Sequence, residues 1–273
     1  MVLQLRSQQP IGVFDSGVGG LTVLREVRRQ LPNESVVYFG DTARLPYGNR
    51  TQAEIVSFVY EILEWLRSQS VKMAIMACNT SSALALEAVR AAFDFPILGI
   101  ILPGARAAVR TGQRIGVIAT TATVRSGSYL RAIAETNPEA QVWQVACPEF
   151  VPLIESQRVD DPYTRAIAQD YLSSLVEYGI DTLVFGCTHY PHLAGLLREL
   201  LPAGVSFVDP AKYVVRAAAK ELELLGLRSN HRRGRTRFYV SGEPAQFAQS
   251  AYPWLGQVPS TQQVPLSHVE LLS

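Results

Sequence analysis

The sequence lacks a long hydrophobic run, an excess of charge of either sign and any leader-like beginning. No stretch of about 18 consecutive apolar residues occurs, so we expect no membrane-spanning helix. The first ten residues lack the apolar core and small-residue cleavage site of a signal peptide, which predicts a cytoplasmic protein. Lys and Arg total 25 and Asp and Glu total 24, a formal net charge of +1. This balance argues against a protein built to coat nucleic acid or an anionic membrane.

Cysteine is also scarce, and its pattern excludes two common uses. Three cysteines cannot all pair in disulfides, and Cys78 and Cys187 lie far apart in the chain. Free thiols in a reducing compartment are therefore the expected state. Cys187 and His189 could ligate a metal, but no paired Cys or His spacing of a zinc site is present. We expect no metal.

The sequence of 273 residues is 48% hydrophobic. Along it, short apolar runs alternate with segments whose apolar residues are spaced as on one face of a helix. Ile55, Val59 and Ile62 follow the helical period, and Thr51 with Glu54 forms a capping box at the start of that helix. Such alternation predicts parallel sheets with helices on both faces. The predicted strands are Ile11–Asp15, Val36–Asp41, Lys72–Cys78, Pro96–Ile100, Arg114–Thr120, Gln141–Cys147, Thr182–Cys187 and Val205–Asp209.

The two halves of this pattern are alike. The motif IGVFDSG at Ile11 is matched by IGVIATT at Ile115, and MACNTSS at Met76 by FGCTHYP at Phe185. We interpret this as a duplication; the alternative is that all doubly wound sheets share such features. After Asp209 a tail follows, with a helix predicted over Val214–Leu225, a strand over Arg237–Ser241 and a helix over Ala245–Trp254. If the tail returns to the first half, the domains are 1–100 plus 211–273, and 101–210. The predicted fold is α/β, with two pseudo-symmetric doubly wound parallel-sheet domains.

Two thiols occupy matching places in the two halves. Cys78 and Cys187 each stand between a strand end and a helix start, where ligands bind in open α/β sheets. Free N–H groups and the helix dipole favour negative charge there, so we expect lowered thiol pKa values. With one thiol on each wall of a cleft, one could remove a proton while the other delivers one, which inverts a stereocentre without a cofactor. The alternative is that each is a small core residue, which is our interpretation of Cys147.

Other motifs suggest different functions, but fewer residues of the sequence support them. Gly17, Gly19 and Gly20 invite a dinucleotide-binding interpretation with Asp41 as the ribose acid, but the third glycine position is Thr22. A nucleophilic Cys187–His189 pair would leave Cys78 without a role. The segment Arg228–Arg237 is read as a solvated basic loop, with a weak nucleic-acid contact or a secondary partner as the alternative. A non-catalytic binding protein that kept the cleft is a further alternative.

Five motifs in order are similar to those of the glutamate racemase family, a cofactor-independent branch of the aspartate/glutamate racemase group. They are FDSGVGGLTVL from Phe14, YFGDTARLPYG from Tyr38, MACNTSSA from Met76, CPEFVPLIE from Cys147 and FGCTHYPHL from Phe185. The resemblance implies two pseudo-symmetric α/β domains with the active site between them, glutamate as substrate and a homodimer. It also implies a role in making D-glutamate for peptidoglycan. Aspartate is the nearest rival substrate.

The resemblance also implies roles for individual residues. Cys78 and Cys187 correspond to the catalytic thiols, with Asp15 assisting the first, and His189 and Glu155 supporting the second. Glu149 and His192 depart from the family's usual apolar residues, which puts local packing in doubt but not the reaction. The implied substrate contacts are Asp15, Ser16, Tyr47, Gly48, Asn79, Thr80, Thr120, Thr121, Thr188 and His189.

Overall fold

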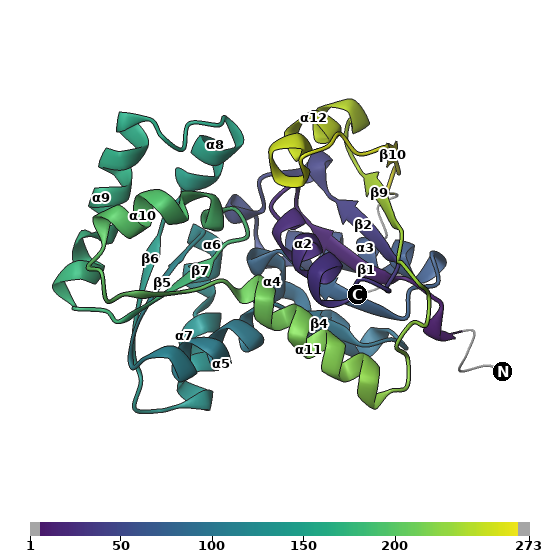
Figure 1. Cartoon of the computed structure of the whole chain (residues 1–273), viewed down its shortest axis with the longest axis horizontal. Helices are drawn as coiled ribbons and strands as arrows, with labels where there is room; N and C mark the ends of the chain where they lie inside the picture. Colours follow the sequence, from purple (N-terminus) through teal and green to yellow (C-terminus); the bar gives the residue numbers. More distant parts are fainter. Residues whose placement is uncertain (1–5, 267–273) are drawn as a thin grey trace.

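Two parallel sheets organise the computed structural model, which describes residues 6–266. Each sheet is the centre of one lobe, and the two lobes lie side by side (Figure 1). The first lobe surrounds a six-stranded sheet in the order β10-β9-β2-β1-β3-β4, and the second a four-stranded sheet in the order β6-β5-β7-β8. The strands are β1 (Ile11–Asp15), β2 (Val36–Gly40), β3 (Met73–Met76), β4 (Ile97–Gly99), β5 (Arg114–Ala119), β6 (Gln141–Ala146), β7 (Thr182–Gly186), β8 (Ser206–Val208), β9 (Thr236–Val240) and β10 (Thr261–Gln263).

The two sheets share one topology. In each, the first four strands along the chain stand in the spatial order second, first, third, fourth, and all paired strands are parallel. The third strands, β3 and β7, therefore occupy equivalent positions, each beside the first strand of its sheet. This confirms the predicted fold class, including its pseudo-symmetry.

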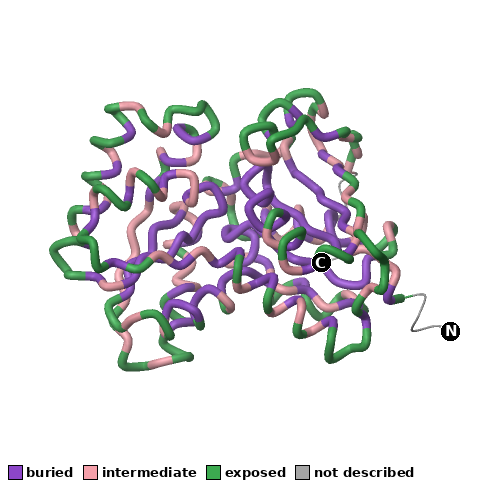
Figure 2. Tube along the Cα trace, in the orientation of Figure 1, coloured by how far each residue is buried: buried purple, intermediate pink, exposed green. Residues whose placement is uncertain are grey.

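Helices cover both faces of the sheets, because successive strand residues point to opposite sides. Val13 belongs to an apolar cluster with residues of α2 and α11, whereas the next residue, Phe14, belongs to a cluster with residues of α3 and α4. Figure 2 shows the buried strands inside a shell of more exposed helices and loops. The helices are α2 (Leu21–Gln30), α3 (Gln52–Ser68), α4 (Asn79–Val89), α5 (Ile101–Thr111), α6 (Thr121–Ser126), α7 (Ser128–Thr136), α8 (Phe150–Glu155), α9 (Pro162–Glu177), α10 (Ala194–Leu200), α11 (Pro210–Leu224) and α12 (Pro244–Leu255).

The C-terminal tail returns to the first lobe. Helix α11 packs against both α2 and α5, and β9 pairs with β2 through Val36 to Gly40. This return supports the division predicted from the sequence, and we propose that the domains are 1–100 plus 211–273, and 101–210. No helix within residues 6–266 has both the length and the apolar character needed to cross a membrane.

Most sequence predictions of elements are confirmed, but several ends were wrong. Some predicted strands were too long because their last residues begin the following helix. Cys78 is the N-cap residue of α4. Asp209 is the N-cap residue of α11, and its carboxylate accepts a hydrogen bond from the Ala211 N–H. Helix α11 consequently begins at Pro210, four residues before the predicted start. The Thr51 and Glu54 capping box is present as predicted. Strand β10 was missed because its Thr-Gln-Gln sequence carries no apolar signal.

A buried ion pair between Lys72 and Glu34 links the C-terminal tail to the first lobe. The Lys72 ammonium group, fully buried, donates hydrogen bonds to the Glu34 carboxylate, to the Ser7 carbonyl oxygen at 2.7 Å and to the Leu227 carbonyl oxygen at 2.8 Å. The other Glu34 oxygen accepts from the Ser229 N–H at 2.8 Å. The pair thus joins segments distant in the sequence just before the tail re-enters the sheet.

Candidate active site

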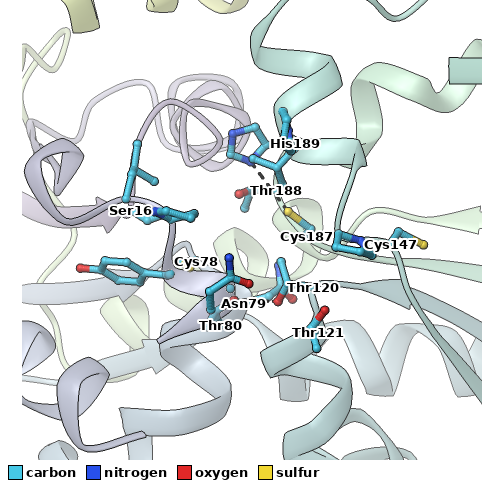
Figure 3. A pocket seen from close by; sticks show the side chains of 18 of the residues that line it. Ser16, Cys78, Asn79, Thr80, Thr120, Thr121, Cys147, Cys187, Thr188 and His189 are labelled. Atoms are coloured by element: carbon cyan, nitrogen blue, oxygen red, sulfur yellow. Dashed lines mark hydrogen bonds between the residues drawn. The ribbon is translucent and has the colours of Figure 1, made fainter. Parts of the chain in front are cut away.

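A cavity of about 340 Å³ lies between the two lobes, at the carboxyl ends of their central strands. Every residue that the sequence resemblance placed at the site lines this cavity except Asp15. The lining residues are Ser16, Leu45, Pro46, Tyr47, Gly48, Asn49, Cys78, Asn79, Thr80, Thr120, Thr121, Cys147, Pro148, Val151, Pro152, Glu155, Cys187, Thr188 and His189. Figure 3 shows how side chains from both lobes meet here.

The Cys78 thiol lines the cavity from the first lobe. It follows β3 and caps α4, and only 7% of the residue is exposed. Burial, and then the negative charge of Asp15, raises the pKa of Cys78 to about 12, although the Ser81 N–H opposes both effects. The expected lowering of the pKa of this thiol is therefore wrong. The helix start does act in the expected direction, but the loss of water around the sulfur outweighs it.

The Cys187 thiol faces the same cavity from the second lobe and belongs to a chain of polar contacts. Its Sγ lies 3.7 Å from Nδ1 of His189 (Figure 3). Nε2 of the same ring lies 3.0 Å from Oε1 of Glu155. Burial lowers the pKa of His189, but the contacts with Cys187 and Glu155 outweigh it and raise the pKa to about 10. An imidazolium beside Cys187 stabilises negative charge on its sulfur.

Two neighbouring histidines are expected to titrate in opposite directions. Burial, and then the charge of His189, lowers the pKa of His192 to about 4, so His192 is neutral at pH 7 while His189 is charged. Because the folded pKa of His189 lies above its ordinary value, its protonation stabilises the fold fully below pH 6.5, and that contribution is lost as the pH rises through about 10. We expect an NMR titration, assigned with His189→Gln, to show a charged ring up to pH 9. Titration of His189 near 6.5 would contradict this geometry.

Asp15 lies behind the cavity wall rather than in it. Its carboxylate accepts from the Gly17 N–H at 2.9 Å and from the Thr188 hydroxyl at 3.3 Å, and burial raises its pKa. The Thr188 carbonyl oxygen accepts a hydrogen bond from the Thr22 hydroxyl at 2.9 Å. Asp15 therefore holds the loop of the second thiol against the first lobe, and it influences Cys78 through its charge.

The glycine-rich loop makes a close contact between the lobes at Gly19. A Cβ atom at Gly19 would lie 2.4 Å from Oγ1 of Thr188 and 2.5 Å from Nδ1 of His189. Any side chain there would push away the loop that carries the second thiol. Gly17, Gly19 and Gly20 do not themselves line the cavity.

Neutral donors surround the space between the thiols. The Thr80 hydroxyl lies 2.9 Å from that of Thr120, which caps α6. The Asn79 side-chain oxygen accepts from the Tyr129 hydroxyl at 2.7 Å, which leaves its buried Nδ2 without a hydrogen-bond partner among the described residues. An unpaired buried amide N–H is costly unless a ligand satisfies it. Asn79 therefore points to an oxygen-bearing ligand in the cavity.

Tyr47 reaches the cavity on a loop held by a buried carboxylate. The Tyr47 hydroxyl donates a short hydrogen bond to Oδ2 of Asp41, which also accepts from Nε of Arg44 at 2.7 Å. Oδ1 of Asp41 accepts from the Ser241 hydroxyl at 2.7 Å. Asp41 is thus a structural anchor of the loop that carries Tyr47 to the cavity, an assignment that the sequence did not suggest.

Sequence reasoning missed several lining residues. Cys147, assigned to the core, is fully buried but also borders the cavity, and burial raises its pKa. The missed apolar wall has no motif of its own because its residues come from separate segments of both lobes. Leu45 and Pro46 lie in a loop of the first lobe, whereas Pro148 precedes α8 of the second lobe and Val151 and Pro152 lie on it. Asn49 was also missed, although it directly follows the predicted Tyr47 and Gly48.

The two departures from the usual motif have local partners. Glu149 accepts from the Tyr163 hydroxyl at 2.6 Å, away from the cavity. The His192 ring lies 3.8 Å from that of Trp254 on α12, which also contacts His189 at 5.4 Å between ring centroids. In the described part of the chain, no group of three His, Cys, Asp or Glu side chains is arranged to hold a metal ion.

Fold and site together define a two-lobed α/β protein with paired thiols in the cavity between its sheets. The family model for Asp/Glu/hydantoin racemases matches residues 11–218, and the chain belongs to this family of amino-acid isomerases. A curated protein of Rippkaea orientalis named "Glutamate racemase" is 63% identical over 264 residues, covering 96% of this chain and 94% of that protein.

Solved structures support the same placement. Glutamate racemase RacE1 of Bacillus anthracis is 37% identical with a TM-score of 0.92, covering 96% of this chain and 100% of that chain. A Francisella tularensis glutamate racemase solved in complex with D-glutamate is 34% identical with a TM-score of 0.89, covering 96% and 98%.

Proposed function

We propose that this protein interconverts L-glutamate and D-glutamate without a cofactor, with Cys78 and Cys187 as its two acid–base groups. One observation carries the proposal: the two thiols follow equivalent strands of two topologically matching sheets and line a single cavity. The curated relatives named glutamate racemase add the choice of substrate. A racemase must reach both faces of one carbon, and a thiol from each lobe provides this.

The proposed step breaks the Cα–H bond of the substrate. A thiolate on one face takes the proton, and the bonding electron pair spreads into the adjacent carboxylate. The opposing thiol then donates its proton to the other face of the carbanion and becomes a thiolate. Because Cys78 is held protonated in the free protein, this form is ready to use Cys187 as the base and Cys78 as the acid. The opposite direction starts from the opposite protonation state.

The remaining polar groups suit a bound amino acid. The Asn79 amide N–H has no hydrogen-bond partner among the described residues, and it can donate to a substrate carboxylate. Other polar groups that line the cavity and can contact the substrate's charged groups are Ser16, Tyr47, Gly48, Thr80, Thr120, Thr121 and Thr188. Such fixed donors stabilise charge that develops in the carboxylate as the carbanion forms. We assign Glu155 to orienting His189, which in turn supports Cys187.

The substrate assignment is tested by comparing both enantiomers of glutamate and aspartate. Aspartate is one methylene shorter, a difference typically worth about 10–200-fold in specificity. We expect polarimetry, with no cofactor added, to show glutamate racemised from either enantiomer and aspartate at least about tenfold more slowly in kcat/KM. Faster turnover of aspartate would make aspartate the substrate in place of glutamate. Turnover of neither acid would favour the alternative of a non-catalytic binding protein.

The cellular context is proposed from membership of the family. We propose that the D-glutamate supplies peptidoglycan synthesis in the cytoplasm, and so contributes to cell-wall formation and cell shape. We also propose a homodimer, which light scattering would show as twice the 30.0 kDa mass of one chain. The basic segment Arg228–Arg237 is exposed at its arginines, as the solvated-loop interpretation expected.

A further inference from the structure

The proposed substrate and the proposed site differ in charge. Glutamate carries two carboxylates and one ammonium group at neutral pH, a net charge of −1. Within residues 6–266, no Lys or Arg lines the cavity, whose positive charge is limited to the buried His189. The neutral donors of this cavity can orient an anion, but they exert little attraction on one still in solvent. Cations that draw the substrate in must lie outside the cavity.

An adjoining hollow supplies such cations. A second depression of about 450 Å³ touches Gly48, Asn49 and Thr121, which also line the substrate cavity. Its wall includes Arg50, just after the Tyr47 loop of the first lobe, and Arg125, on α6 of the second. The two guanidinium groups therefore approach from opposite lobes, and only the shared residues separate them from the cavity.

The two arginines differ in how far they are already neutralised. Nη1 of Arg50 lies 3.2 Å from Oε1 of Glu54, so part of its charge is compensated. Arg125 is exposed and forms no ion pair within the described ranges of the chain. Arg125 is thus the cation beside the cavity whose charge is most available to a passing carboxylate.

We propose that this hollow is an outer anion subsite, in which Arg125, assisted by Arg50, attracts anionic amino acids before they enter the neutral cavity. The ligand class is a small mono- or dicarboxylate. This inference rests on the proposed function, because it assigns to the subsite the same substrate. It makes Arg125 a determinant of substrate capture rather than a catalytic residue.

The test is the ionic-strength dependence of racemisation by Arg125→Gln and Arg125→Glu. At about 10 mM salt, where charges act over about 30 Å, we expect Arg125→Gln to lower kcat/KM about 3–10-fold and leave kcat within about twofold. Arg125→Glu should lower kcat/KM further. The differences should vanish near 1 M salt, where the screening length is about 3 Å. The matched control is Arg110→Gln, an exposed arginine on α5 outside both hollows, which should behave as the parent protein.

Each outcome decides the matter. A salt-independent loss in Arg125→Gln would indicate a structural role and overturn the inference, as would an equal loss in Arg110→Gln or no loss at low salt. If the parent protein racemises glutamate and the Arg125 variants have the same kcat/KM as the parent at low salt, only the subsite is refuted. If the parent protein does not racemise glutamate at all, the proposed function fails and the inference fails with it.

Discussion

Replacing either Cys78 or Cys187 by Ser is expected to lower kcat by about 10²–10⁴-fold in both directions of the reaction. Each thiol serves as the base toward one enantiomer and as the acid toward the other, so no direction is spared. A serine hydroxyl keeps nearly the same size and hydrogen bonds, but it is a far weaker acid than a thiol. The measurement is the initial rate from L-glutamate and from D-glutamate, with circular dichroism confirming that the variants fold.

Cys147 provides the matched control for the thiol variants. It borders the same cavity and is even more buried than the other two, but the equivalent strand of the first lobe, β2, is followed by Asp41 and not by a cysteine. We expect Cys147→Ala to stay within about fivefold of the parent rate. Full activity of Cys78→Ser in both directions would refute the two-thiol mechanism. An equal loss in all three variants would mean that packing around the cavity, not proton transfer, sets the rate.

The second large effect is on stability. Lys72→Met should lower the free energy of unfolding by about 3–5 kcal/mol, because it leaves the Glu34 carboxylate buried without its partner. It also removes the hydrogen bonds that hold the Ser7 and Leu227 carbonyl groups together. Urea unfolding measures the change. The control is Lys220→Met, at an exposed position of α11, and it is expected to stay within about 0.5 kcal/mol of the parent.

A double variant separates the effect of an unpaired buried charge from the loss of the Lys72–Glu34 ion pair itself. A double variant, Lys72→Met with Glu34→Gln, removes both charges and should recover part of the lost stability, because no uncompensated ion remains. A loss below about 1 kcal/mol in Lys72→Met alone would show that the pair does not fasten the tail. Such a result would leave the site unaffected, since the pair lies outside the cavity.

The sequence predicted the fold and most of the cavity because both depend on repeated local signals. The alternation of apolar strand segments with helical segments places Cys78 and Cys187 at the ends of equivalent strands. Parallel strands bring such ends to the same edge of a sheet. The ordered motifs then supplied Asn79, Thr80 and His189. All three line the cavity. What their side chains do in the reaction is a proposal that the variants above test.

What the sequence could not predict depends on contacts between distant segments. The pKa of Cys78 is set by burial and by the Asp15 charge, and neither can be read from its own helix start. The role of Gly19 arises only where Thr188 and His189 of the other lobe come close. Asp41 acts on Tyr47 together with Ser241, which lies 200 residues further along the chain.

The most direct test of the central claim is the fate of the α-proton at the start of the reaction in deuterated water. Two different monoprotic thiols should give product that carries deuterium at the α-carbon while the unreacted enantiomer still carries hydrogen, from either direction. NMR of the two enantiomers after separation measures this. Product that retains the substrate's own proton, or deuterium appearing first in the starting enantiomer, would indicate a single base and contradict the assignment of Cys78 and Cys187.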